Sequence, residues 1–385
     1  MHARLRASMG MCAAHTRRLI EDIGDGHIVT TVMRQAVLGA LQHLGGDDPP
    51  GACPACEAVS VAAGRAAQVV ADGLTDPGHA RLYNEHTGLC LPHVALATRT
   101  SKPAELELLV RRLIESLRAA DGQLLIETVG GVDRDAPRRR ARRGALPASP
   151  SAQTTVAELW ERLAVDSCPV CLSAGSIERD YVRWFVERSR ERDTSIRNDP
   201  GELCARHLHD VALADPGVAA DAAQRQRAAR RGELARLLDA LSEPAPTGRQ
   251  ERRVWAGKLE HARAQFTGEH YCSACHARSE IERSQLALVA AALALRPVHE
   301  RYVDSHGLCA RHALKLRHAG DALPVLSHAR ARLGVLGWEL HETARKYAWA
   351  CRHEVPGPER DAWVRAMAQI DGGVFEGGPA PRQVP

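Results

Sequence analysis

The sequence repeats one arrangement of cysteine and histidine three times, and this repeat constrains the fold more than any other feature. In each copy a Cys-x-x-Cys pair (CxxC) is followed by a Cys-x-x-His pair (CxxH), with 33, 32 and 33 residues between the second and third cysteines. Nearly equal gaps indicate three related units, whereas a lone CxxC would be a weak signal. The three sets are Cys53, Cys56, Cys90 and His93; Cys168, Cys171, Cys204 and His207; and Cys272, Cys275, Cys309 and His312.

Each set combines three cysteines with one histidine, which is the ligand set of a common structural zinc site. A CxxC pair brings two sulfurs toward one ion from a single tight turn, and a CxxH pair does the same for a sulfur and a ring nitrogen. Four protein ligands leave no open position for water or substrate, so the pattern indicates a structural site rather than a catalytic one. Nine of the eleven cysteines belong to these sets, and we therefore expect about three zinc ions per chain.

Other uses of these residues stay open. Three cysteines and a histidine can also hold an iron–sulfur cluster, so the pattern does not exclude one. CSACH at 272–276 matches the c-type haem attachment pattern, but Glu57 and Leu172 replace the histidine in the other two copies. The CxxC pairs also resemble thioredoxin-type redox motifs, which need a strand before the helix, whereas the flanking residues here have helical periodicity.

Helical patterns follow the ligand pairs. Apolar residues recur at helical spacing after each CxxC, and longer helices are predicted at 104–120, 225–242 and 326–347. Aromatic residues make up only 4% of the chain, so aliphatic side chains must dominate the core. We predict an all-α fold of tandem helical units, each held together by a Cys₃His metal site whose ligands lie at helix N-termini, where the helix dipole favours thiolate.

A further CxxH pair, Cys12 and His15 in GMCAAH, precedes the three copies and has no CxxC before it. A long apolar-striped segment follows at 28–44. Two explanations are open: the natural chain starts upstream of Met1 and supplies a fourth CxxC, or the pair belongs to a degenerate cap, as terminal repeats often do. A third is that Cys351 and His353 complete a site with this pair.

The repeat also sets the predicted domain boundaries. The divisions are an N-terminal half unit (1–48), three metal-binding units (49–130, 154–243 and 244–371), a linker rich in Arg, Pro, Ala and Ser (131–153), and a disordered tail (372–385).

The linker carries a run of positive charge. Five of the six residues at 138–143 are arginine, which is compatible with contact to nucleic acid or an anionic surface. The formal net charge of the whole chain is only +4, so total charge does not indicate nucleic-acid binding. The five are Arg138, Arg139, Arg140, Arg142 and Arg143.

The chain has no run of about 18 apolar residues, and MHARLRASMGMC at its start contains no apolar signal-peptide core. We therefore expect no membrane contact and a cytoplasmic location. In that compartment cysteines more often bind metal or perform redox chemistry than form structural disulfides.

The order of elements in the repeat is CPxC, a helix, a DP turn, a GLCxxH stretch and a long helix. This order resembles an uncharacterised prokaryotic family whose domains carry CPxC…G[LF]CxxH repeats. The resemblance covers residues 53–120 and 272–347 best; in the second copy Glu202 takes the glycine position, and in the third Ser273 replaces proline. The resemblance implies a helical, metal-binding protein and brings no established activity.

These features favour a zinc-binding scaffold that interacts with a protein partner. One alternative is a thiol-based redox or metal sensor that releases zinc on oxidation, and another is nucleic-acid binding through the arginine run. Paired-carboxylate motifs, glycine-rich phosphate loops and Ser–His–Asp strings are not recognisable, so an enzymatic activity is not indicated, although such triads assemble in space rather than in sequence.

Overall fold

The computed structural model of this chain is helical. It describes residues 1–85, 89–98, 101–130, 155–191, 202–243, 247–267, 272–317, 322–351 and 353–372. Within these ranges no β-strand forms, and extended backbone pairs only at isolated bridge residues such as Glu202 with Cys272, so the all-α prediction is confirmed. A search of the described helices finds none with the length and apolar character to span a membrane. The arginine run at 138–143 and residues 373–385 of the predicted tail lie outside the described ranges.

The chain divides into two compact units, and each is assembled from segments that are far apart in sequence. Unit 1 contains residues 1–58, 148–180 and 276–385, and unit 2 contains residues 59–147 and 181–275. Each unit therefore mixes parts of several predicted repeats. The predicted boundaries are drawn from the repeat in the sequence, whereas the two units are defined by contacts between residues in the folded chain.

Ligand pairs begin helices throughout the described chain. Each CxxC begins a long helix: α4 (Pro54–Gly73), α9 (Pro169–Arg190) and α14 (Ser273–Ala292). Each CxxH begins a shorter one: α2 (Ala13–Arg18), α6 (Leu91–Ala97), α11 (Ala205–Ala214) and α16 (Ala310–Leu316). Proline at the first position of α4 and α9 suits a helix start, because the N–H that it lacks would have no partner there. The prediction that ligands lie at helix N-termini is confirmed.

A second, longer helix follows each CxxH helix. These helices are α3 (Gly26–Gly45), α7 (Pro103–Gly130), α12 (Pro216–Ser242) and α17 (Leu323–Lys346). The predicted segments agree with them, except that α7 continues to Gly130 rather than ending at residue 120, and α12 begins at Pro216 rather than at residue 225. The early start of α12 has a local cause: the Asp215 side chain accepts hydrogen bonds from the N–H groups of Gly217 and Val218, and proline takes the first position.

Shorter elements complete the described chain. They are α1 (His2–Ala7), α5 (Pro77–Glu85), α8 (Val156–Arg162), α13 (Arg249–Thr267), α15 (Arg296–Asp304) and α18 (Ala362–Asp371), with the turns η1 (Leu19–Ile23), η2 (Trp349–Cys351) and η3 (Pro358–Asp361).

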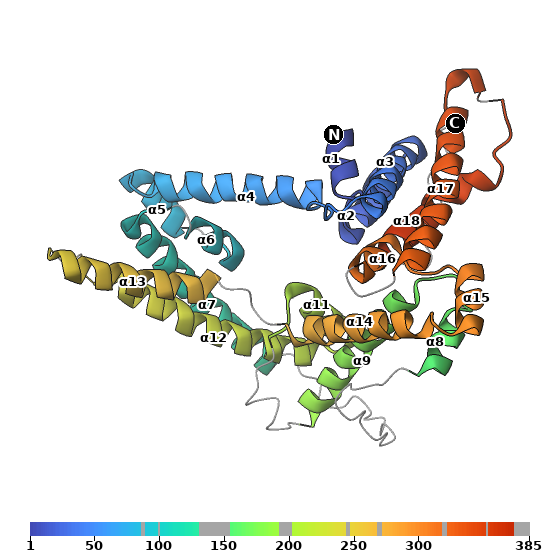
Figure 1. Ribbon diagram of the computed structural model, residues 1–385. Helices are drawn as coiled ribbons and strands as arrows, with labels where there is room; N and C mark the ends of the chain where they lie inside the picture. The colour runs from blue at the N-terminus through green and yellow to red at the C-terminus, as the bar shows by residue number, and fades with distance from the viewer. Residues whose placement is uncertain are drawn as a thin grey trace. The chain divides into compact units, whose positions relative to one another are not determined.

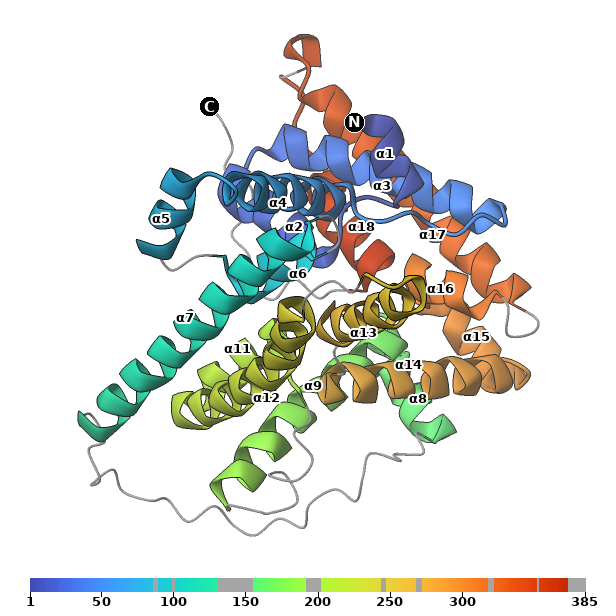
Figure 2. The same ribbon diagram turned by 90° about the vertical axis from the view of Figure 1, so that its left-hand side faces the viewer.

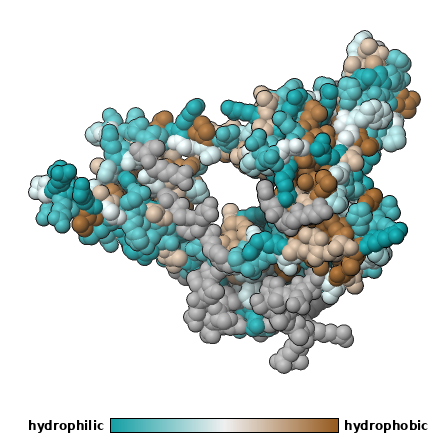
Figure 3. Space-filling view, viewed as in Figure 1, coloured by the Kyte–Doolittle hydropathy of each residue, from teal (hydrophilic) through white to brown (hydrophobic). Residues whose placement is uncertain are grey.

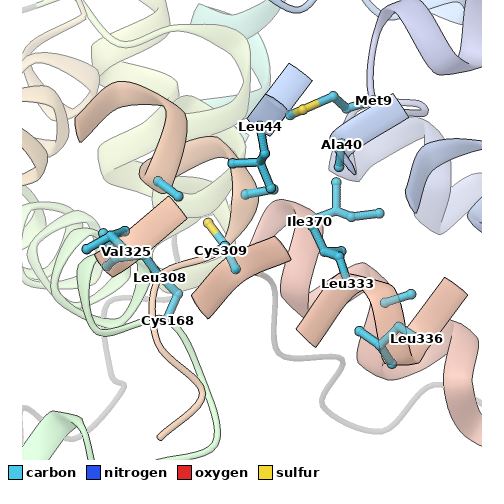
Figure 4. Close-up of a cluster of buried hydrophobic side chains, with 14 of the residues drawn as sticks. Met9, Ala40, Leu44, Cys168, Leu308, Cys309, Val325, Leu333, Leu336 and Ile370 are labelled. Carbon is cyan, nitrogen blue, oxygen red and sulfur yellow. The ribbon is translucent and has the colours of Figure 1, made fainter. Parts of the chain in front are cut away.

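In unit 1, α3 and α17 lie side by side and pack with α18 (Figure 1). Cys168 and Cys309 belong to the same buried cluster as the apolar residues of these helices, so two of the candidate metal ligands lie inside the core. On the face shown in Figure 3, hydrophobic residues gather over α18, whereas most of the surface over α12 and α13 is hydrophilic. Figure 4 shows the centre of this cluster, with Met9, Ala40, Leu44, Leu333, Leu336 and Ile370.

In unit 2, α12 packs against both α7 and α13 (Figure 2). The apolar stripe expected on α7 is buried there, and α12 contributes Leu234 and Leu237 to the same core. The short helix α6, which carries a CxxH pair, packs against α7 and α13. The buried stripe of α7 contains the expected Leu106, Leu109, Leu113, Ile114 and Leu117, together with Val110.

Candidate metal centres

Three groups of ligand side chains converge in the described chain, and each contains three cysteines and one histidine. Within each group the four potential ligand atoms all lie within 4.8 Å of one another. Sites A and B lie in unit 1, and site C lies in unit 2. Site A is Cys12, His15, Cys53 and Cys56; site B is Cys168, Cys171, Cys309 and His312; site C is Cys204, His207, Cys272 and Cys275.

The structure corrects the grouping expected from the sequence. The expected sets joined each CxxC to the next CxxH along the chain, and that grouping is wrong for all three. The first CxxC lies with Cys12 and His15, which the sequence had left without a partner. The CxxC of the second copy lies with the CxxH of the third copy, and the CxxH of the second copy lies with the CxxC of the third. The predicted Cys₃His composition is present in each site, because any CxxC and any CxxH together supply it.

The separations of the ligand atoms in site B suit a single tetrahedral ion. Zinc bond lengths of about 2.3 Å to sulfur and about 2.0 Å to nitrogen imply edges of about 3.8 Å between sulfurs and about 3.5 Å between sulfur and nitrogen. His312 Nδ1 lies 3.2 Å from the Sγ atoms of both Cys171 and Cys309. It lies 3.5 Å from Cys168 Sγ, and the sulfurs of Cys171 and Cys309 are 3.8 Å apart.

Sites A and C repeat this arrangement. In both, the Nδ1 atom of the histidine faces all three sulfurs, so the same ring nitrogen would bind the ion in every site. In site A, His15 Nδ1 lies 3.2, 3.8 and 3.4 Å from the sulfurs of Cys12, Cys53 and Cys56. In site C, His207 Nδ1 lies 3.2, 3.3 and 3.5 Å from the sulfurs of Cys204, Cys272 and Cys275.

Every CxxH pair reaches its position through the same local backbone. The cysteine precedes the first residue of a helix in extended conformation, with φ between −71° and −64° and ψ between 159° and 164°. The sulfur therefore lies at the positive end of the helix dipole, and the histidine follows in the first turn. The four cysteines in this position are Cys12, Cys90, Cys204 and Cys309.

The imidazole of His312 in site B has a partner on each side. Its Nδ1 faces the sulfurs, and its Nε2 lies 3.8 Å from the Glu282 carboxylate of α14. Glu282 accepts hydrogen bonds from Lys315 Nζ at 2.6 Å and Arg278 Nε at 3.0 Å. The facing His312 lowers the pKa of Glu282 far below its ordinary value; burial opposes this effect, and Lys315 and Arg278 add to it. An ionised carboxylate behind a ligating histidine fixes the ring and increases its basicity toward a metal.

A glycine closes site B. Gly372 has a φ of +71°, and a Cβ atom there would overlap Cys171 Sγ and lie 3.3 Å from Cys309 Sγ. The carbonyl oxygen of Asp371 lies 3.8 Å from Cys171 Sγ, and the Asp371 carboxylate forms an ion pair with Arg311. The C-terminal end of α18 therefore covers the sulfurs, and only a residue without a side chain fits at this position.

Sites A and C are more open than site B. Cys56 in site A and Cys275 in site C are exposed, whereas Cys168 and Cys309 of site B are buried. Solvent and small reagents can therefore reach at least one sulfur in each of sites A and C. They cannot reach the buried sulfurs of Cys168 and Cys309 in site B.

The thiols of site C differ in acidity. Burial acts to raise the pKa of Cys272, but hydrogen bonds from the backbone N–H groups of Cys204 and Cys275 outweigh it, and the pKa falls to about 7. Burial and the neighbouring Cys272 raise the pKa of Cys275 to about 12. One thiol therefore ionises near neutral pH, and the other loses its proton there only when a metal displaces it.

Cys90 and His93 do not join any of the three sites. Their Sγ and Nδ1 atoms lie 3.1 Å apart, and among the residues that the structure describes no third metal-ligating side chain completes a group around them. Cys351 also lies outside the sites, and Arg345 Nη1 donates a hydrogen bond to its Sγ at 3.0 Å. The idea that Cys351 completes a site with Cys12 is therefore wrong.

A tyrosine hydroxyl holds the loop before two of the CxxH pairs. Tyr302 Oη accepts a hydrogen bond from the N–H of Leu308 at 2.9 Å, and Tyr83 Oη accepts one from the N–H of Leu89 at 3.1 Å. Each tyrosine precedes the cysteine of its CxxH pair by seven residues, so the alignment of the copies contained this signal, although the sequence alone did not indicate a role for the tyrosines. The second copy repeats Glu282 as Glu178 within a shared Ile-Glu-Arg string, but the sequence alone did not indicate that Glu282 faces a ligand histidine.

Two cavities adjoin these elements. In unit 2 an apolar cavity of about 490 Å³ has Cys204 and Cys272 of site C in its wall. In unit 1 a polar cavity of about 220 Å³ is lined by residues that include Asp166, His306 and Arg332. His306 Nδ1 lies 3.4 Å from Asp166 Oδ1, and burial, together with the nearby Arg332, lowers the pKa of His306. None of the residues lining the polar cavity is a ligand of sites A to C.

Comparison of the chain with protein-family models, with curated proteins and with solved structures gives no match. The class of the protein therefore follows from its own geometry. It is an all-α protein whose described part contains three Cys₃His groups with the separations of metal sites.

Proposed function

We propose that this protein is a zinc-binding helical scaffold in which three closed Cys₃His sites hold together helices from distant parts of the chain. The observation that carries the proposal is the arrangement of the ligand atoms, because in every site one Nδ1 and three Sγ atoms lie at the separations of a tetrahedral ion. Thiolate and imidazole ligands in this geometry favour zinc over the hard ions magnesium and calcium.

The free energy available from such sites is large enough to determine the fold. A structural zinc site contributes about 10–16 kcal/mol at neutral pH, and a whole domain is stable by only about 5–15 kcal/mol. In site B the ion would join the start of α9 to the start of α16, whose ligands Cys171 and Cys309 are 138 residues apart. The metal would therefore stabilise contacts that the chain order alone does not favour.

The surface of unit 1 supports a role in binding a protein partner. Large apolar side chains remain exposed near the C-terminal part of α17 and the segment after it, and aromatic side chains are enriched at protein interfaces. Exposed side chains of this kind are Val335, Trp338, Tyr347, Trp349 and Val355.

Elemental analysis of the purified full-length chain tests the proposal. We expect at least three zinc ions per chain, and we expect a chelator to lower both the helical circular dichroism and the midpoint of thermal unfolding. Iron with acid-labile sulfide would identify clusters instead of zinc. Fewer than one metal ion per chain, with unchanged helicity after chelation, would contradict metal binding altogether.

A second candidate function is thiol-based sensing, and the difference in exposure among the sites favours it. Cys56 and Cys275 are accessible, whereas the sulfurs of Cys168 and Cys309 are not. Peroxide should then release the zinc of sites A and C first, and a reductant should restore it. Simultaneous release of all three ions, accompanied by unfolding, would support a purely structural role.

A further inference from the structure

Cys90 and His93 form a preformed pair of metal ligands. The backbone of Cys90 has φ −71° and ψ 163°, close to the −64° and 159° of the site B ligand Cys309. The distance from Cys90 Sγ to His93 Nδ1 is 3.1 Å, compared with 3.2 Å in each of the three CxxH pairs that lie in sites. The pair therefore has the geometry of a ligand pair and supplies two of the four positions around a tetrahedral ion.

Among the described residues of unit 2, none supplies the remaining two positions. Cys90 is exposed and His93 is half-buried, whereas the corresponding residues of site B, Cys309 and His312, are both buried. Two protein ligands alone do not make a closed zinc site, which needs four.

Every CxxC pair of the chain already belongs to a site. No CxxC pair of the described residues therefore remains to complete the coordination of Cys90 and His93. The two missing ligands would be soft or imidazole donors, and a second polypeptide can supply them.

The order of the ligand pairs along the chain points to a ligand role for this pair. In the second half of the chain, site C is formed by an inner CxxH and CxxC, and the CxxH that follows them, Cys309 with His312, is a ligand pair of site B. In the first half, site A is likewise formed by a CxxH and a CxxC, and Cys90 with His93 is the CxxH that follows them. Cys90 with His93 and Cys309 with His312 therefore occupy equivalent positions in the repeat.

We propose that Cys90 and His93 bind a zinc ion together with the same two residues of a second copy of this chain. The inference rests on the proposed function, because it assumes that the CxxH pairs bind zinc. A twofold axis through the ion lets one surface patch meet its own copy and fills all four positions with two sulfurs and two nitrogens. The result is a Cys₂His₂ set, which is a standard closed zinc site in which two thiolates balance the charge of the ion.

The test uses the full-length chain with zinc added until binding is saturated. We expect 3.5 zinc ions per chain by elemental analysis and a mass twice that of one chain by light scattering. The half-integral value follows because two chains share one ion. Dilution into a chelator should remove this ion first and return the protein to single chains that still hold three ions each.

Substitution separates this site from the other three. Cys90→Ser should lower the zinc content from 3.5 to 3.0 per chain and convert the dimer into a monomer, with unchanged circular dichroism because Cys90 is exposed. Cys351→Ser is the matched control, because it removes one thiol outside the proposed sites, and it should keep both the dimer and the 3.5 ions.

Other results would overturn the inference. A wild-type monomer with three zinc ions, unaffected by Cys90→Ser, would reject the shared site and leave the scaffold proposal intact. Loss of one full ion in Cys90→Ser would show that Cys90 is a ligand within its own chain, and a chain without zinc would reject both proposals.

Discussion

The Sγ atom of Cys171 lies 3.2 Å from Nδ1 of His312, although 141 residues separate the two along the chain. The histidine 36 residues after Cys171, His207, instead faces Cys272 Sγ at 3.3 Å. The N-terminal end of α9 therefore belongs to unit 1 together with α16, and α11 belongs to unit 2. Ligand pairs that form one site therefore lie in the same unit, whereas the CxxC and CxxH pairs of one sequence copy do not.

Paired substitutions distinguish the two ways of grouping the ligands. Cys168→Ser combined with Cys309→Ser removes two ligands of one site and should lower the zinc content by one ion. Cys168→Ser combined with Cys204→Ser affects two sites and should lower it by two ions. Elemental analysis of both variants, with folding checked by circular dichroism, measures the difference.

The reverse result, two ions lost in the first variant and one in the second, would restore the grouping expected from the sequence. The variants are matched because each removes two cysteines, so a general effect of losing thiols cannot produce the difference between them.

Gly372→Ala should weaken site B. The left-handed backbone alone costs a non-glycine residue about 1–2 kcal/mol, and the added methyl group would also overlap Cys171 Sγ. We expect a lower midpoint of thermal unfolding and faster loss of one zinc ion to a chelator. Gly257→Ala in α13 is the control, since no atom lies within 4 Å of a Cβ there, and it should raise stability by about 0.5–1 kcal/mol. Equal zinc retention in the two variants would contradict the covering role of Gly372.

Glu282→Gln should weaken zinc binding at site B without removing a ligand. The substitution replaces the carboxylate that faces His312 Nε2, and loss of such a partner typically reduces metal affinity about 10–100-fold. Competition with a chromogenic chelator would show one of the ions released at lower chelator concentration. Glu300→Gln is the control, because Glu300 pairs with Arg296 on the exposed face of α15 and should leave all ions unchanged.

Tyr302→Phe should destabilise unit 1 more than Tyr83→Phe destabilises unit 2. Each substitution leaves a backbone N–H without its hydrogen-bond acceptor, but the N–H of Leu308 is fully buried, whereas Leu89 is only half-buried. An unsatisfied buried donor costs about 1–3 kcal/mol, and a donor that water reaches costs less. Denaturant unfolding of the two variants measures the difference, and equal effects would count against the burial argument.

The ligand residues and the helix starts were readable from the sequence because both depend on short stretches of chain. A CxxC or CxxH turn converges on an ion through four residues, and the buried stripe of α7 from Leu106 to Leu117 follows directly from helical periodicity. The start of α12 is also marked locally, by Asp215 before the helix and Pro216 at its first position. The late start predicted for this helix could therefore have been corrected from the sequence. Glu282 and Gly372 could not be found in this way, because their roles depend on contacts with α16 and Cys171.

The sequence by itself determined that this chain would be all-α, that its cysteines and histidines would lie at helix N-termini, and that Cys₃His sets would form. Only the tertiary structure decided which CxxC meets which CxxH. In site B, Cys171 and Cys309 are 138 positions apart, and closing this loop instead of one of about 33 residues costs roughly 1 kcal/mol more in chain entropy. Burying a single leucine contributes about 1.5–3 kcal/mol, so the packing of α3, α17 and α18 outweighs the preference for the nearest partner.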